Sequence, residues 1–252
     1  MCEHCHQPSR REVLKGVALG LAGAALAGCP PEQPLNELPN AYEEHVPDES
    51  GIRPKINEPK IDESKIVVPP PQPPQVSDYG SIMPRSAWTT APLELRNGTP
   101  MGAVTKVTIH HSGDGKPFAP ATAADVARHL QIVLQAHLQR GMIDIGYHFA
   151  VDPQGRVWQL RSPNYEGQHV RMSANGFHNN EHNVGVVALG DFNLQVVPAA
   201  QRDRLLELVR QIRAKYKLPP AAVFMHGEIV QTDCPGKNLK PVIVDARRRN
   251  LV

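Results

Sequence analysis

A histidine and a cysteine lie eight residues apart in the string MHGEIVQTDCPG, residues 225–236, on either side of a predicted loop. They are His226 and Cys234. Catalytic zinc is usually held by three protein ligands drawn from histidine, cysteine and carboxylate, and its fourth position takes a water that becomes the nucleophile. Together with His110, from the string TIHHS upstream, these residues fit that pattern. The sequence therefore predicts a three-ligand zinc site.

The cysteines are unevenly distributed along the chain. Cys2, Cys5 and Cys29 lie near the N-terminus, and only Cys234 lies in the part that has the composition of a folded domain. A lone cysteine in a folded part cannot form an internal disulfide, so Cys234 is an inert core thiol, a nucleophile or a metal ligand. The Cys-Pro-Gly turn is expected to expose its sulfur, which argues against the inert core thiol.

The N-terminal residues 1–29 are predicted to be an export signal. Arg10 and Arg11 precede a short apolar run that ends in LAGC at Cys29. Paired arginines before an apolar segment are the twin-arginine pattern, and about twelve apolar residues are too few to cross a hydrocarbon core of about 30 Å, so a transmembrane helix is the weaker alternative. The LAGC string resembles a bacterial lipoprotein site. We expect an exported protein of the periplasm or cell envelope, anchored to the membrane through lipidated Cys29.

Residues 30–78 have the composition of a disordered linker. Twelve of the chain's 25 prolines lie between residues 30 and 77, with few large apolar residues between them. Such a segment cannot build a core, and PPPQPP at residues 69–74 favours a stiff polyproline II spacer. A passive tether is the preferred interpretation, and a proline-rich partner motif is the alternative.

Residues 79–252 have the length of one domain with one core. The formal net charge of the whole chain is +2, and no long basic run is interleaved with aromatic residues. Nucleic acid is therefore not an expected partner, and the three arginines at residues 247–249 are interpreted as a solvated tail. We expect a monomer.

The predicted secondary structure alternates strands with helices. Residues 104–109 alternate like a strand and deliver His110 and His111 at its end; since adjacent strand residues face opposite sides, at most one of the two points into a given site. The other predicted elements are a helix capped by Thr122 that runs to about Gln139, a hairpin over 145–160, a buried strand from Asn183, a helix over 201–216 and a strand over 223–226. This order predicts an α/β fold with a single mixed central β-sheet flanked by helices.

Five strings in order resemble the amidase type 2 and peptidoglycan recognition family. They are IMPRSAW (82–88), TIHHS (108–112), IGYHF (145–149), NVGVVALGDF (183–192) and HGEIVQTDCPG (226–236). The resemblance covers nearly all of residues 80–240 and implies the fold of that family. It also implies its activity, hydrolysis of the amide bond between N-acetylmuramic acid and L-alanine, with peptidoglycan or muropeptides as substrate.

The resemblance implies a role for each matching residue. His110, His226 and Cys234 would bind Zn²⁺, with His111 a neighbour and not a ligand. Tyr147 matches a tyrosine that assists at the reacting carbonyl. Thr232 matches a position that holds threonine in many animal members and lysine in bacteriophage members. Glu228 and His169 are weaker candidates for the proton acceptor.

The polar segment 167–185 resembles the loop that lines the family's groove for glycan and peptide stem. His169 matches a histidine often found there, and Asn175 and His178 are further candidates for substrate binding. The string FHNNEHN before the strand departs from the family's usual pattern, so substrate preference stays open.

Three functions are compatible with these residues. The preferred one is a zinc amidase acting on peptidoglycan. The second is a non-catalytic peptidoglycan-binding protein, which often lacks the cysteine ligand. The third is a cysteine hydrolase that uses Cys234 with His226 as base, whose activity would survive chelation but not thiol alkylation.

Overall fold

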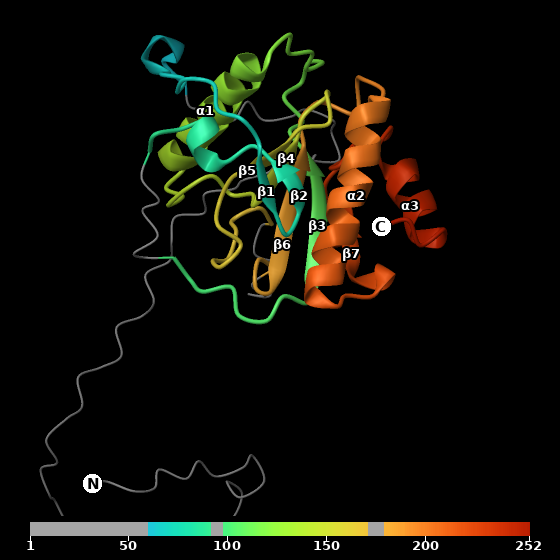
Figure 1. Ribbon diagram of the computed structural model, residues 1–252. Coiled ribbons are helices and arrows are strands. Elements are labelled where there is room, and N and C mark those ends of the chain that lie inside the picture. Colours follow the sequence, from blue (N-terminus) through green and yellow to red (C-terminus); the bar gives the residue numbers. More distant parts are fainter. Residues whose placement is uncertain (1–59, 92–97, 171–178) are drawn as a thin grey trace, which may run out of the picture. The chain divides into compact units, whose positions relative to one another are not determined.

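The computed structural model describes residues 60–91, 98–170 and 179–252 (Figure 1). Within these residues the main sheet has five strands in the order β5-β4-β6-β3-β7. The strands are β3 (Lys106–His111), β4 (Phe149–Val151), β5 (Val157–Gln159), β6 (Asn183–Ala188) and β7 (Val223–Met225). β6 pairs in parallel with β3 and β4, β3 pairs in parallel with β7, and β5 pairs antiparallel with β4. The sheet is therefore mixed, as predicted, and the hairpin over 145–160 is confirmed.

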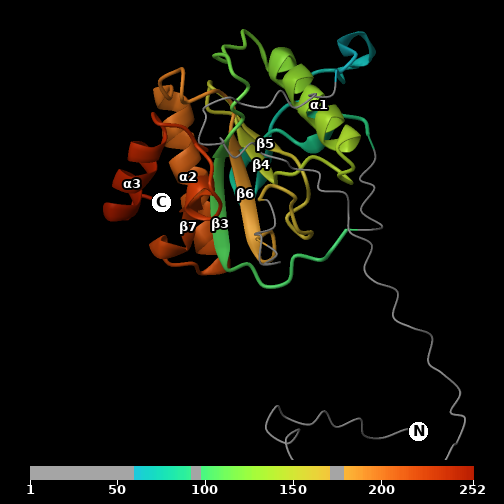
Figure 2. The ribbon, with the colours of Figure 1, turned by 180° about the vertical axis from the view of Figure 1, so that it is seen from behind.

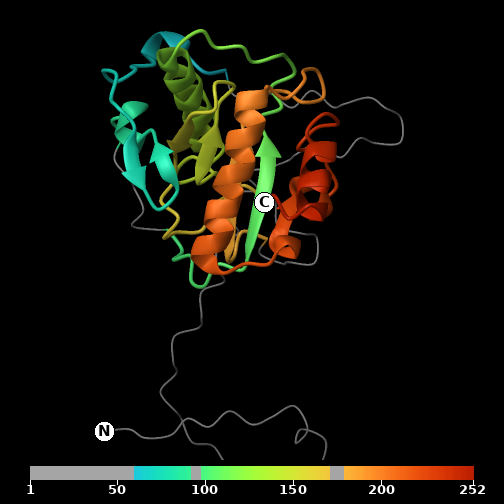
Figure 3. The ribbon, with the colours of Figure 1, turned by 45° about the vertical axis from the view of Figure 1, so that its right-hand side comes forward.

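Helices cover both faces of this sheet. They are α1 (Ala123–Gln139), α2 (Ala199–Tyr216) and α3 (Lys240–Arg248). Figures 2 and 3 show α1 on one side of the sheet and α2 on the other. The strands contribute side chains to the hydrophobic clusters on both faces of the sheet, because successive side chains point to opposite faces. Val186 of β6 packs in the cluster of α2 and α3, and its neighbour Val187 packs in the cluster of α1. The predicted fold class is confirmed.

The ends of α1 follow the predicted signals. The Thr122 side chain accepts a hydrogen bond from the Asp125 amide, and the Asp125 carboxylate accepts one from the Thr122 amide. This capping box satisfies two donors that the first helical turn leaves without partners. Beyond the C-cap, Gly141 has a positive φ of 81°, a conformation that glycine adopts without steric penalty.

The helix α3 was not predicted, and the arginines at residues 247–249 are not simply a solvated tail. Arg247 donates to the Glu228 carboxylate at 2.7 Å and to the main-chain oxygen of Val223 at 3.1 Å. Ile243 and Ala246 of the same helix are buried in the core. The C-terminal segment therefore packs on β7. Within the described ranges, no helix is both long enough and apolar enough to cross a membrane.

Part of the predicted linker packs against the domain. Residues 60–78 include η1 (Glu63–Lys65) and the strand β1 (Gln75–Ser77), which pairs with β2 (Gly80–Ile82). The side chain of Gln131 in α1 donates to the main-chain oxygen of Val67. These contacts extend the domain beyond its predicted start at residue 79. The remainder of the linker and the signal with Cys29 lie outside the described residues. Among the described residues, the other short 3₁₀ helices are η2 (Arg85–Ala87), η4 (Pro220–Ala222) and η5 (His226–Glu228).

Candidate metal centre

The last two residues of β3 are His110 and His111, and their side chains diverge. His110 pairs in register with Val187, whose side chain packs on the α1 side of the sheet. His111 lies over the opposite face, where its Nδ1 accepts a hydrogen bond from the Phe192 amide at 3.2 Å and its ring stacks on the Phe192 ring. Only His110 joins the other predicted ligands, as the alternation of the strand requires.

The second and third predicted ligands come from the chain that follows β7. His226 is the first residue of η5, immediately after β7, and β7 lies beside β3 in the sheet. The loop then folds back, because the Gly227 amide donates to the Cys234 carbonyl at 3.0 Å. A Cβ on Gly227 would lie 2.8 Å from the Thr232 carbonyl oxygen, so this close approach requires glycine. The loop thereby brings Cys234 to the end of β3.

The donor atoms of His110, His226 and Cys234 form one buried cluster. One ligand atom from each residue lies within 4.8 Å of the other two. Nδ1 of His110 is 3.8 Å from Sγ of Cys234, and the centroids of the two imidazole rings are 4.5 Å apart. Nitrogen and sulfur ligands about 2.1 and 2.3 Å from a tetrahedral zinc lie about 3.6 Å from each other. Two imidazoles and one thiolate at these separations fit a zinc ion.

Cys234 is buried, in contrast to the sequence prediction of an exposed sulfur. Its residue surface is 6% exposed. The turn does lie near the surface, since Asp233 beside it is exposed, but the cysteine side chain points inward against the end of β3. There Sγ accepts a hydrogen bond from the His111 amide at 3.4 Å. This hydrogen bond holds the sulfur at the end of β3, beside His110, and cysteine binds metals as its thiolate.

Burial keeps the histidines of this cluster neutral. Loss of water around the ring lowers the pKa of His226 to about 4, with His111 as a further cause. The pKa of His110 is also lowered well below its usual value, first by burial and then by His226 and His169. Neutral imidazoles have a lone pair for a metal ion. Both imidazoles therefore have the protonation state that metal binding requires near neutral pH.

Tyr147 and Thr232 lie beside the cluster. The ring of Tyr147 meets the ring of His110 edge to face, with 5.2 Å between their centroids. The hydroxyl oxygen of Thr232 accepts a hydrogen bond from the Cys234 amide at 3.2 Å. A hydroxyl that accepts one bond still has its own proton to donate, so Thr232 both shapes the turn and offers a donor next to Cys234.

His169 lies behind His110 and is only 1% exposed. Its Nδ1 is 3.0 Å from Nε2 of His110, and its Nε2 is 3.1 Å from the main-chain oxygen of Asn183. This placement directs the side chain at His110. The other two residues predicted to bind substrate, Asn175 and His178, lie outside the described residues.

Glu228 is directed away from the cluster. Its carboxylate forms an ion pair with Arg247 and accepts a hydrogen bond from the Met225 amide at 2.7 Å. The structure therefore gives it a role in joining η5 to α3. It does not support Glu228 as the proton acceptor.

Sequence reasoning missed the groups that hold His169. A Cβ on Gly167 or on Gly185 would lie 2.4 Å from the His169 ring, so both glycines leave space for that ring. The Thr108 hydroxyl donates to the side-chain oxygen of Asn183 at 2.9 Å, and so it holds the residue whose main-chain oxygen faces His169. The glycine in the middle of NVGVV was a usable signal, since glycine inside a strand often marks a close approach.

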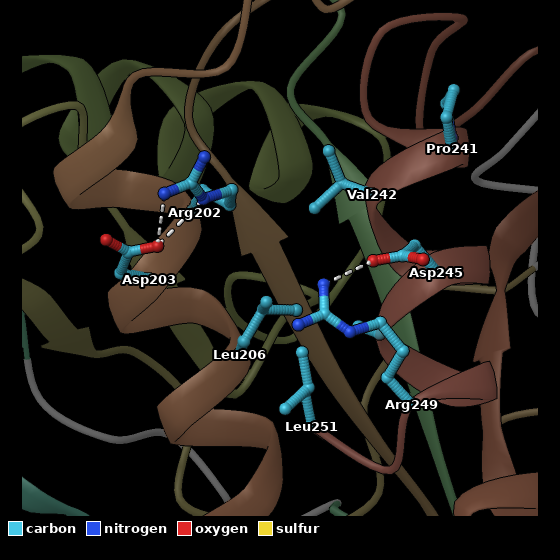
Figure 4. Close-up of a pocket in the computed structure, with 9 residues that line it drawn as sticks. Arg202, Asp203, Leu206, Pro241, Val242, Asp245, Arg249 and Leu251 are labelled. Atoms are coloured by element: carbon cyan, nitrogen blue, oxygen red, sulfur yellow. Dashed lines mark hydrogen bonds and ion pairs between the residues drawn. The ribbon is translucent and has the colours of Figure 1, made fainter.

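A separate hollow of about 530 Å³ lies between α2 and α3 (Figure 4). Arg202 pairs with Asp203 at 2.7 Å and Arg249 pairs with Asp245 at 3.1 Å, so the charged groups on its rim neutralise one another. None of the predicted site residues lines this hollow. It is therefore distinct from the histidine and cysteine cluster.

Known proteins resemble this chain over the part that contains the cluster. The profile of the family described as N-acetylmuramoyl-L-alanine amidase matches residues 100–237, more than half of the 252 residues. A peptidoglycan-recognition protein of Drosophila simulans is 26% identical over 161 residues, which cover 64% of this chain and 84% of that protein. An N-acetylmuramoyl-L-alanine amidase of Sus scrofa is 30% identical over 168 residues, which cover 63% of this chain and 26% of that protein.

The fold has a counterpart among solved structures. A mutant of Drosophila PGRP-LB in complex with tracheal cytotoxin superposes with a TM-score of 0.54 and 26% identity, over 66% of this chain and 92% of that chain. The matched residues 100–237 include all three candidate ligands together with Tyr147 and Thr232. The chain therefore belongs to the N-acetylmuramoyl-L-alanine amidase family.

Proposed function

We propose that this protein is a zinc-dependent amidase that hydrolyses the bond between N-acetylmuramic acid and L-alanine in peptidoglycan or its muropeptides. The observation that carries the proposal is the buried cluster of His110, His226 and Cys234, whose ligand atoms lie within 4.8 Å of one another inside the family match. When bound there, zinc supplies Lewis-acid activation of water and of the scissile carbonyl.

The residues around the cluster have defined tasks in this proposal. The phenol of Tyr147, beside His110, donates a hydrogen bond to the oxygen on which negative charge develops in the transition state. The Thr232 hydroxyl is the second donor on the Cys234 side. The buried rings of His110 and His226 exclude water from one side of the site, which strengthens these polar interactions.

A non-catalytic peptidoglycan-binding protein is the second candidate. The observation that favours it is the similarity to proteins named for peptidoglycan recognition, one of them seen in complex with tracheal cytotoxin. The presence of Cys234 and Tyr147 in this chain supports the amidase. Both functions share peptidoglycan fragments as ligand, so binding alone does not separate them.

The test is release of stem peptide from muropeptides by the full-length protein, followed by mass spectrometry. The amidase predicts cleavage that a chelator abolishes, that added zinc restores, and that Cys234→Ala lacks. Binding of muropeptides without cleavage would favour the recognition protein. Cleavage that survives chelation but is lost after thiol alkylation would favour a cysteine hydrolase.

We further propose that the protein is exported and anchored in the cell envelope through lipidated Cys29, and that it acts as a monomer. The support is the sequence itself, with Arg10 and Arg11 before an apolar run that ends at Cys29. Mass spectrometry of the mature N-terminus tests the anchor. A chain that begins at acylated Cys29, and a Cys29→Ser variant that leaves the membrane fraction, are the expected results; an unprocessed N-terminus would contradict them.

A further inference from the structure

The two ring nitrogens of His110 face different partners. Nδ1 faces Sγ of Cys234 at 3.8 Å, and Nε2 lies 3.0 Å from Nδ1 of His169. On the far side of His169, Nε2 lies 3.1 Å from the main-chain oxygen of Asn183 in β6. One nitrogen of His110 thus belongs to the candidate metal centre, and the other begins a chain of hydrogen bonds that ends on the sheet.

The Asn183 carbonyl, at the end of this series of hydrogen bonds, determines which imidazole nitrogens carry protons. A carbonyl oxygen only accepts hydrogen bonds, so Nε2 of His169 carries a proton and donates it to Asn183. In a neutral imidazole the other nitrogen is then an acceptor, so Nδ1 of His169 accepts from Nε2 of His110. Nδ1 of His110 is left with a lone pair. That lone pair is on the side of Cys234, where a metal ligand needs it.

The surroundings of His169 hold its ring in this position. The residue is 1% exposed, and a Cβ on either Gly167 or Gly185 would come within 2.4 Å of the ring. The Asn180 side chain accepts from the amides of His169 and Val170 at 3.0 and 2.9 Å and donates to the Val170 carbonyl at 2.7 Å. Protein contacts alone therefore hold both the main chain and the ring of His169.

We propose that His169 is a positioning residue for the metal site. Its Nε2 donates a hydrogen bond to the Asn183 carbonyl, and its Nδ1 accepts one from Nε2 of His110. His110 therefore has an unprotonated Nδ1 that can bind zinc. The inference rests on the proposed zinc amidase and deepens it, because it gives a residue predicted to bind substrate a task in metal binding. Groups that hydrogen-bond to metal-ligating histidines commonly change metal affinity about 10- to 100-fold.

The first experiment compares zinc affinity by competition with a chromophoric chelator in the full-length protein. His169→Leu keeps the volume but removes the acceptor, and we expect its zinc affinity to fall about 10- to 100-fold. His169→Asn carries an amide oxygen at the branch position of Nδ1 and should restore most of that loss. The matched control is His137→Leu, which removes another buried histidine, one that accepts from the Gly146 amide and is not among the candidate ligands. It should lower stability and leave zinc affinity unchanged.

The second experiment needs no variant. Long-range ¹H–¹⁵N correlation spectra of the zinc-free wild-type protein report which imidazole nitrogen carries the proton. We expect a proton on Nε2 of both His110 and His169; a proton on Nδ1 of His110 would overturn the inference even if His169→Leu fails to fold.

The outcomes separate this inference from the proposed function. If the wild type binds zinc and His169→Leu binds it equally well, or if His169→Asn is as weak as His169→Leu, the positioning role is wrong and the zinc amidase stands. If the wild type binds no zinc, the proposed function fails and this inference fails with it.

Discussion

Removal of the buried histidine His137 should make the protein less sensitive to acid. His137 lies on α1 and accepts a hydrogen bond from the Gly146 amide at 3.0 Å. Burial lowers its pKa to about 3, and the positive charges of Arg140 and Arg161 add to the shift. In the unfolded chain the ring has the ordinary value of 6.5. Between these two values the unfolded state binds more protons than the folded state, so acidification favours unfolding.

The size of the effect follows from the two pKa values. At pH 5, about 1.5 units below the unfolded-state value, protonation stabilises the unfolded chain by about 2 kcal/mol, since one unit corresponds to about 1.4 kcal/mol. The folded state gains almost nothing at that pH because its pKa is about 3. In His137→Asn this contribution is absent. The loss of unfolding free energy between pH 7.5 and pH 5 should therefore be about 2 kcal/mol smaller in the variant than in the wild type.

The assay is urea unfolding at both pH values in the presence of a chelator, which removes the pH-dependent contribution of metal binding from both proteins. The control is Leu134→Ala, a buried residue on the same helix without a titratable group. It should lose stability equally at both pH values and keep the wild-type pH dependence. An equal pH dependence in His137→Asn and the wild type would refute the reasoning, since it would mean that His137 becomes protonated without unfolding.

Three further substitutions have defined outcomes. Tyr147→Phe should retain zinc, measured by mass spectrometry of the metal, while kcat for muropeptide cleavage falls about 10²- to 10³-fold, because one donor to the developing oxyanion is lost; an unchanged kcat would remove Tyr147 from the reaction. Gly185→Ala should lower the free energy of unfolding in urea by about 1–3 kcal/mol and weaken zinc binding, because the added Cβ would lie 2.4 Å from the His169 ring; tolerance of alanine would show that the ring is not tightly held. Thr122→Ala should lower stability by about 1 kcal/mol through loss of the cap on α1, with zinc affinity as the unaffected control readout.

Much of the fold could be predicted because local signals agree with the final structure. Thr122 and Asp125 at the start of α1 form a capping box that the sequence pattern indicates, and the alternation of β3 separates His110 from His111. The helix α3 could not be predicted in this way. It has nine residues, and a helix this short depends on tertiary contacts, here the packing of Ile243 and the ion pair of Arg247 with Glu228.

In the candidate site, too, some features could be predicted from the sequence and others could not. The residue types and the spacing of His226 and Cys234 indicate a metal site because zinc chemistry requires such ligands. The partner of His110 could not be found from sequence, because His169 lies 59 residues away and meets it only after β3 and β6 pair. The burial of Cys234 was missed for a related reason: a turn predicts the course of the main chain, but the direction of the side chain depends on β3 beside it.

The metal content of the purified full-length protein tests the central claim most directly. A catalytic zinc is held by three protein ligands, and water takes its fourth position. We therefore predict about one zinc per chain in the wild type. After the same dialysis, Cys234→Ala should retain far less, because it has lost one of the three ligands. Circular dichroism would show that the variant keeps its fold. A wild-type protein that retains no zinc at neutral pH, or a folded Cys234→Ala that retains as much as the wild type, would contradict the assignment of His110, His226 and Cys234 as a zinc site.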